Sequence, residues 1–281
     1  MVIDILIVII ILLYLIFASI SDIKTREVPD YLSYSLVIIV SVLKVLDAVT
    51  KKDIRILLYS FIGFAVFYGL SLLMYYSRQW GGGDAKLLIS LGIAFPTYPE
   101  FLLKFLNPNL NSPFLLIITI NLLILGSIYS FIYIFFIILK NRKRLKEIKI
   151  KINRYLLIIP LLFIVVSLFI PSPLKLISLF IAFLSLIYPY LLGLIKDIER
   201  ICMLQTIPLS KLTEGDWIPK SIYYKNKLIY NRNSPGITKK QIALLKKHKF
   251  KKITVKYGIP FVPSFLFTII FSLLLGNLIP F

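Results

Sequence analysis

Apolar runs of about twenty residues recur along this chain, and they limit its folding more than any other feature. A helix needs roughly 20 apolar residues to cross a bilayer, and several runs reach that length. Of the 281 residues, 58% are hydrophobic, and the mean hydropathy is +0.87. This composition excludes a soluble globular domain. The sequence therefore predicts an all-α polytopic membrane protein with about eight transmembrane helices.

The predicted spans are separated by short segments rich in charge, proline or asparagine. Five spans form a membrane core at 1–139, two form an additional hairpin at 155–195, and one closes the chain at 259–281. The first run has no basic segment before it and no small-residue cleavage site after it, so we interpret it as a retained helix. The spans of the core are expected at residues 3–20, 31–46, 54–76, 84–105 and 114–139.

Two segments outside the spans are strongly basic. Residues 140–154 hold a cluster of Lys and Arg and are expected to form a loop. Residues 196–258 are mostly polar, with β-like runs at 221–224, 228–230 and 252–255 and an expected helix at 238–248. This pattern predicts a small α/β or mixed soluble domain before the last helix.

The distribution of Lys and Arg predicts the orientation of the chain. The formal net charge is +20, and loops 23–30, 77–86, 140–154 and 196–258 hold most of the 33 Lys and Arg. Because cytoplasmic loops accumulate Lys and Arg, we expect these loops on the cytoplasmic side of the cell membrane and both termini on the outer side. The charge also favours anionic lipids as partners. No groove-binding or aromatic-platform motif accompanies it, so no nucleic-acid partner is expected.

One carboxylate, that of Asp84, lies at the edge of a predicted span directly after three glycines. An acid at such a position is a candidate functional residue, because a charge in the membrane is costly. Gly81, Gly82 and Gly83 have no Cβ, so another backbone, such as a substrate strand, could approach Asp84. Asp22, at the end of the first span, is expected at the same depth on the same side.

Two aspartates that meet at this depth have a specific chemistry. They cannot comfortably both ionise, so one holds a proton while the other acts as a general base on a water molecule. Titration then belongs to the pair. A single Cys202 and a single His248 exclude multi-cysteine and multi-histidine metal sites, so we expect no metal or cofactor. Alternatively, Asp84 only caps the N-terminus of the span that follows it, and Asp22 only marks the end of a helix in water.

The segment Gly81-Gly82-Gly83-Asp84 resembles the Gly-x-Gly-Asp motif of intramembrane aspartyl proteases. Residues 22–30, Asp-Ile-Lys-Thr-Arg-Glu-Val-Pro-Asp, are similar to the first-aspartate motif of type IV prepilin peptidases. Together the two features resemble the archaeal preflagellin and prepilin peptidases, and residues 1–140 carry most of this resemblance.

This resemblance implies an endopeptidase that cuts the short basic leader (the class III signal peptide) from prepilin or prearchaellin substrates at the cytoplasmic face. Asp22 and Asp84 would be the catalytic pair, and the three glycines would admit the substrate strand. Glu27 and Asp30 could attract the basic leader. The chain lacks the cysteine cluster of bacterial prepilin peptidases, which is consistent with cleavage without methylation. The hairpin 155–195 and the domain 196–258 depart from the six-span archaeal pattern.

Two other classes remain open at this point. A presenilin-like or signal-peptide-peptidase-like protease would carry its first aspartate on the span just before the Gly-x-Gly-Asp span, and here two further spans intervene. A cation-coupled transporter would use the same two acids as ligands, but such proteins often have inverted repeats and midplane polar groups. A structural membrane subunit would tolerate the loss of both acids.

Overall fold

The computed structural model describes residues 2–77, 79–141, 154–172, 174–234 and 236–279. The chain is mostly helical, and it divides into two compact units. The first unit consists of Met1–Tyr133 together with Ile207–Phe281, and the second consists of Ile134–Thr206. Both predicted candidate acids, Asp22 and Asp84, belong to the first unit.

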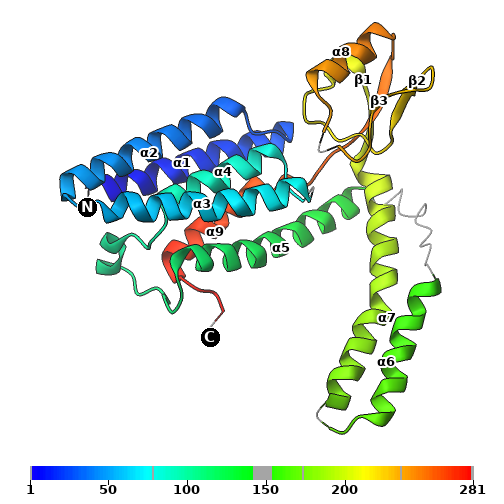
Figure 1. Cartoon of the computed structure of the whole chain (residues 1–281), viewed down its shortest axis with the longest axis horizontal. Helices are drawn as coiled ribbons and strands as arrows, with labels where there is room; N and C mark the ends of the chain where they lie inside the picture. Colours follow the sequence, from blue (N-terminus) through cyan, green and yellow to red (C-terminus); the bar gives the residue numbers. More distant parts are fainter. Residues whose placement is uncertain (1, 78, 142–153, 173, 235, 280–281) are drawn as a thin grey trace. The chain divides into compact units, whose positions relative to one another are not determined.

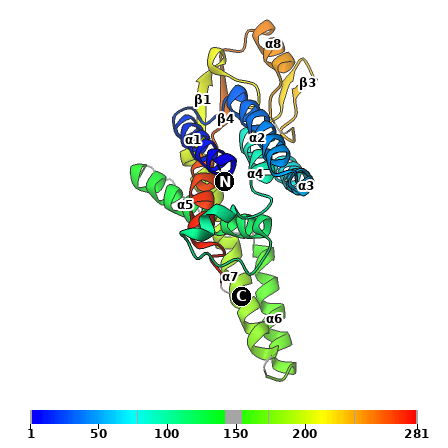
Figure 2. The ribbon, with the colours of Figure 1, turned by 90° about the vertical axis from the view of Figure 1, so that its left-hand side faces the viewer.

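The core of the first unit is a bundle of apolar helices (Figures 1 and 2). Helix α4 contacts α1, α2 and α3, and α9 packs against α1. Their inward faces share one hydrophobic cluster that includes Ile11, Leu36, Leu88 and Phe265, all fully buried. The helices of this bundle are α1 (Val2–Thr25), α2 (Asp30–Lys51), α3 (Arg55–Tyr76), α4 (Gly82–Ala94), α5 (Phe114–Lys140) and α9 (Val262–Leu275).

Five helices of the described residues are long and apolar enough to cross a membrane, compared with the eight spans that the sequence predicts. They are α1, α2, α3, α5 and α7 (Leu174–Ile198), the last extended by a π-turn at Glu199–Met203. The remaining predicted spans contain shorter helices: α4, α6 (Ile158–Phe169) and α9. The predicted span 84–105 is interrupted because Pro96 and Pro99 follow α4, and only a 3-10 turn, Glu100–Lys104, comes after them.

The polar segment before the last helix folds as a small mixed module. Its own hydrophobic cluster includes Ile207, Tyr230, Leu245 and Val255. Strand β2 pairs antiparallel with β3, and β1 pairs with β4. The predicted strands and helix are confirmed as β2 (Ile222–Tyr224), β3 (Lys227–Tyr230), β4 (Lys252–Lys256) and α8 (Lys239–Lys247), whereas β1 (Leu204–Pro208) was not predicted. Thr238 caps α8 by accepting the Gln241 N–H.

The second unit is dominated by the hairpin of α6 and α7. The Ser178 hydroxyl of α7 donates to the Phe163 carbonyl of α6 at 2.8 Å, which satisfies a polar group between the two apolar helices. Because α7 continues to Ile198, the polar segment begins later than the predicted boundary at residue 196. Of the predicted basic loop 140–154, residues 142–153 lie outside the described residues.

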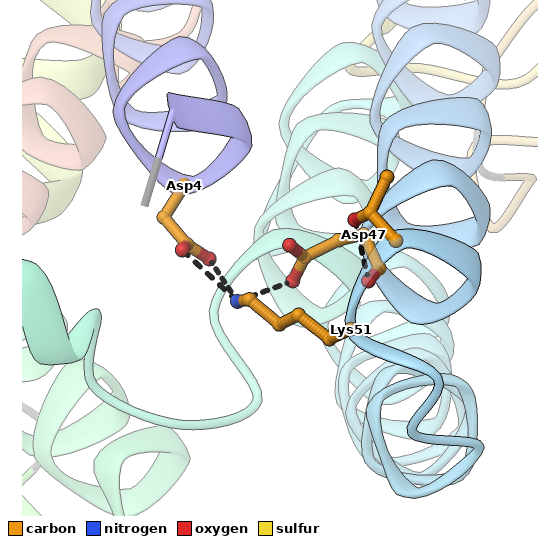
Figure 3. Close-up of polar contacts among 4 residues, drawn as sticks. Asp4, Asp47 and Lys51 are labelled. Carbon is orange, nitrogen blue, oxygen red and sulfur yellow. Dashed lines mark hydrogen bonds and ion pairs between the residues drawn. The ribbon is translucent and has the colours of Figure 1, made fainter.

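A charge cluster joins α1 to α2 at the end of α1 farthest from Asp22 (Figure 3). The Lys51 ammonium lies 3.1 Å from an Asp4 carboxylate oxygen and 2.9 Å from one of Asp47. Asp47 is only 2% exposed, so its charge needs this partner. The interaction also explains why α2 runs to Lys51 rather than ending at the predicted Leu46.

Two glycines let α3 and α4 approach each other backbone to backbone. A Cβ on Gly63 would lie 2.1 Å from the Gly92 carbonyl oxygen, and a Cβ on Gly92 would lie 2.3 Å from the Gly63 carbonyl oxygen. Small residues at helix crossings allow this close packing inside membranes. The crossing fixes α4, and therefore Asp84, against the bundle.

We predict that Gly63→Ala destabilises the protein by about 1–3 kcal/mol, the usual range for overpacking. Alanine is the better helix former by roughly 1 kcal/mol, so a loss of stability would have to come from the contact with Gly92. Thermal unfolding in detergent measures the effect. Gly69→Ala on the same helix is the control, because nothing lies within 4 Å of its added Cβ. Equal stability of the two variants would contradict the prediction.

Candidate active site

Asp22 lies in the last turns of α1 with its carboxylate buried. It is 7% exposed, and its Oδ2 accepts the backbone N–H of Val262 at 2.9 Å. The helix ends shortly after it, because Arg26 adopts the left-handed conformation (φ 63°). The Arg26 N–H donates to the Asp22 carbonyl at 2.9 Å and closes the last turn. The carboxylate is therefore fixed by backbone from the other end of the sequence.

Asp84 lies in the first turn of α4. Gly81 precedes the helix in an extended conformation, and its N–H donates to Asp84 Oδ2 at 3.0 Å. This bond satisfies one of the N–H groups that a helix N-terminus leaves free. The Asp84 side chain is therefore both a local cap, as the capping alternative predicts, and a carboxylate held in a defined direction.

The two aspartates occupy one region of the first unit. The charge on Asp22 lies within electrostatic range of Asp84. The segments that donate to them are also in contact: the Trp80 ring, next to Gly81, lies 5.7 Å from the ring of Phe261, next to Val262. The structure thus brings two carboxyl groups within electrostatic range of each other, and carboxyl groups are residue types that can act as general acid and general base.

The loop between α1 and α2 carries the other predicted site residues. Glu27 accepts a hydrogen bond from the Thr213 hydroxyl of the small module. Asp30 pairs with Lys86 at 2.5 Å, and Lys86 also lies 4.6 Å from the centre of the Tyr34 ring. Asp30 is the first residue of α2, and it forms no cap at the start of this helix. Its carboxylate is instead drawn to the neighbouring ammonium.

The three glycines have different surroundings. A Cβ on Gly83 would lie 2.8 Å from Val28 Cβ, so this glycine gives room to the α1–α2 loop. A Cβ on Gly82 would meet only Tyr75 at 3.8 Å, and one on Gly81 only the Asp84 carboxylate at 3.5 Å. The role of the glycines in admitting a substrate strand stays a prediction.

Sequence reasoning missed the residues that hold Asp22 in place. Arg26 lies within electrostatic range of Asp22, donates to the Gly258 carbonyl at 3.1 Å and stacks over the Tyr133 ring. Its position one helical turn after Asp22 was the available signal. For Val262 the signal was Pro263, because proline marks the first turn of a helix.

Comparison with known proteins shows which family the segment with both aspartates is similar to. Residues 9–139 match the model of the type IV leader peptidase family. This segment contains both Asp22 and Asp84 and ends at the last residue of the predicted membrane core. The resemblance inferred from the sequence is therefore confirmed over the part of the chain that carried it.

The individual relatives are archaeal peptidases. The preflagellin peptidase of Methanococcus maripaludis is 33% identical over 127 residues, which are 45% of this chain and 55% of the relative. Prepilin peptidase EppA of Methanothermobacter thermautotrophicus is 30% identical over 152 residues, 52% of this chain and 40% of the relative. The chain thus spans about half the length of these relatives. No solved structure shows significant similarity to it.

We predict that Gly83→Ala lowers the free energy of unfolding of the protein by about 1–3 kcal/mol, because the added methyl overlaps Val28. Gly82→Ala is the matched control in the same helical turn and should be tolerated. Thermal unfolding of both variants in detergent provides the comparison. The double variant Val28→Gly/Gly83→Ala should recover part of the stability that Gly83→Ala loses. If the stability changes of the two single variants simply add, the two residues do not contact each other.

Proposed function

We propose that this protein is a membrane-embedded aspartyl endopeptidase that removes the short basic leader from type IV pilin-like or archaellin precursors. The single observation that carries the proposal is that Asp22 and Asp84 lie within electrostatic range of each other, inside the segment that matches the leader peptidase family. The names of the relatives, preflagellin and prepilin peptidases, support this class of substrate.

The proposed reaction uses the two carboxylates as a pair with one proton. The ionised member takes a proton from water, whose oxygen attacks the scissile carbonyl, and the protonated member donates to the carbonyl oxygen. Collapse of the tetrahedral intermediate breaks the C–N bond: the leaving nitrogen takes a proton from the aspartate that now holds it, and the other aspartate recovers a proton from a hydroxyl of the intermediate, which returns the pair to one proton. Each carboxylate already has one oxygen bound by a backbone N–H, which restricts how it can turn.

We also propose that all eight apolar segments cross or enter the cell membrane, with the active site at the cytoplasmic face. The positive-inside distribution of Lys and Arg supports this orientation. In the same arrangement the small module at 207–258 would lie in the cytoplasm. Its helix α8 exposes Lys239, Lys240, Lys246 and Lys247 and buries Ile242 and Leu245, which suits contact with anionic lipid headgroups.

The basic leader of such a precursor would meet acids of the α1–α2 loop and the small module. Glu27 is exposed and has no cationic partner among the described residues. Asp216 lies close to it: burial raises the pKa of Asp216, and the charge of Glu27 raises this pKa further, while the Thr213 N–H opposes the shift. Two neighbouring acids that repel each other favour a cation between them.

The two aspartates provide the first test. We predict that Asp22→Asn and Asp84→Asn each abolish cleavage of a prepilin or prearchaellin precursor in membranes, because an amide cannot hold the shared proton. Membrane levels and thermal unfolding should stay close to those of the wild type. Asp53→Asn, in the turn between α2 and α3, is the control and should cleave normally. Cleavage that survives in either site variant would favour a cation-binding or structural role.

The two candidate leader-binding acids, Glu27 and Asp30, should contribute differently to substrate binding. Because Lys86 already neutralises Asp30, we predict that Glu27→Gln raises the KM for a basic leader several-fold, while Asp30→Asn changes it much less. Neither should alter kcat strongly, since neither acid touches the reacting atoms. Steady-state kinetics with precursors whose leader lysines are kept or replaced measure both effects. A larger KM effect at Asp30 would reverse the assignment.

A further inference from the structure

The last helix of the chain, α9, begins at the Asp22 carboxylate. Val262 is the first residue of this helix, and its N–H donates to Asp22 Oδ2 at 2.9 Å. The backbone of Phe261, the residue before it, also lies near this carboxylate. These residues follow the matched segment 9–139 by more than a hundred positions, so the family match assigns them no role.

The physical need for this bond is mutual. The first N–H groups of a helix have no partner inside the helix, and Val262 is fully buried, so its N–H needs an acceptor. Asp22 is a buried carboxylate that needs a donor. The helix N-terminus also carries a partial positive charge, which suits an ionised acid. The single hydrogen bond between them satisfies both the donor and the acceptor.

Aromatic packing fixes the N-terminus of α9 relative to Asp84. The Trp80 ring lies 5.7 Å from the Phe261 ring and 5.5 Å, edge to face, from that of Phe265. Gly126 of α5 leaves room for Phe261, since a Cβ there would lie 2.6 Å from its ring. Trp80 is followed at once by Gly81, whose N–H binds Asp84.

The far end of α9 is fixed as well. The Asn121 amide of α5 donates to the Ser272 hydroxyl and to the Gly276 carbonyl, each at 2.8 Å. The Tyr98 hydroxyl donates to the Leu273 carbonyl at 2.7 Å. With both ends held, α9 can serve as a rigid support for the carboxylate at its start.

From this geometry we infer that α9 is part of the catalytic centre, with the Val262 N–H as the positioning group that holds Asp22 in the orientation needed to act with Asp84. The inference rests on the proposed function for its catalytic consequence. The hydrogen bond and its effect on Asp22 can be tested even if the proposed function is wrong.

The experiment removes this N–H alone. Cell-free synthesis into lipid nanodiscs can replace Val262 by its α-hydroxy analogue, which converts the amide into an ester and keeps the side chain. Loss of a group that orients a functional ligand commonly costs about 10–100-fold, and we expect a fall in kcat in this range with KM within about twofold. The matched control is the same ester at Ile269, a fully buried residue in the middle of α9.

A second readout is independent of cleavage. Dicyclohexylcarbodiimide modifies protonated carboxyl groups within membranes, and a lost N–H donor leaves a carboxylate easier to protonate. Mass spectrometry should therefore find Asp22 labelled several-fold faster in the Val262 ester than in the wild type or the Ile269 ester. Unchanged labelling would overturn the positioning role. Faster labelling with an unchanged kcat would show that the hydrogen bond exists but that α9 has no role in catalysis. Faster labelling in a protein whose wild type cleaves no precursor would refute only the proposed function.

Discussion

A carboxylate among apolar helices needs hydrogen-bond donors, and in this protein the backbone at two helix N-termini supplies them. Val262 donates to Asp22 from the start of α9, and Gly81 donates to Asp84 from the start of α4. Such donors stay in place because the helices hold them, and they bring no further charge that would itself need burial. The location of both acids therefore depends on where α4 and α9 begin.

The surrounding packing serves to bring these two helix starts together. The crossing at Gly63 and Gly92 lets α4 lie directly against α3, and the Trp80 ring joins the segment before α4 to Phe261 and Phe265 of the last helix. Val28 of the α1–α2 loop packs against Gly83, at the start of α4.

Much of this arrangement follows from local sequence, and the remainder depends on contacts between distant residues. Apolar length predicts the helices, and the glycines before Asp84 mark the candidate site. The end of α2 was predicted too early, because the Lys51 ammonium binds Asp47 on the same helix and Asp4 on α1, and the helix continues through both Asp47 and Lys51. The Val262 donor lies 240 residues from Asp22 and is a backbone group, so Pro263 marks the start of its helix but no pattern indicates that this start lies at Asp22. Lys86 binds Asp30 across 56 residues of sequence, another contact that local patterns do not indicate.

The central claim is that Asp22 and Asp84 act as one catalytic unit, and a double-mutant cycle on single-turnover cleavage tests it most directly. Residues that act as a unit are strongly non-additive. The account predicts that Asp22→Asn, Asp84→Asn and the double variant all fall to the same background rate on a prepilin-type precursor in lipid nanodiscs. Rate losses that add, with the double variant far slower than either single one, would contradict a shared catalytic role.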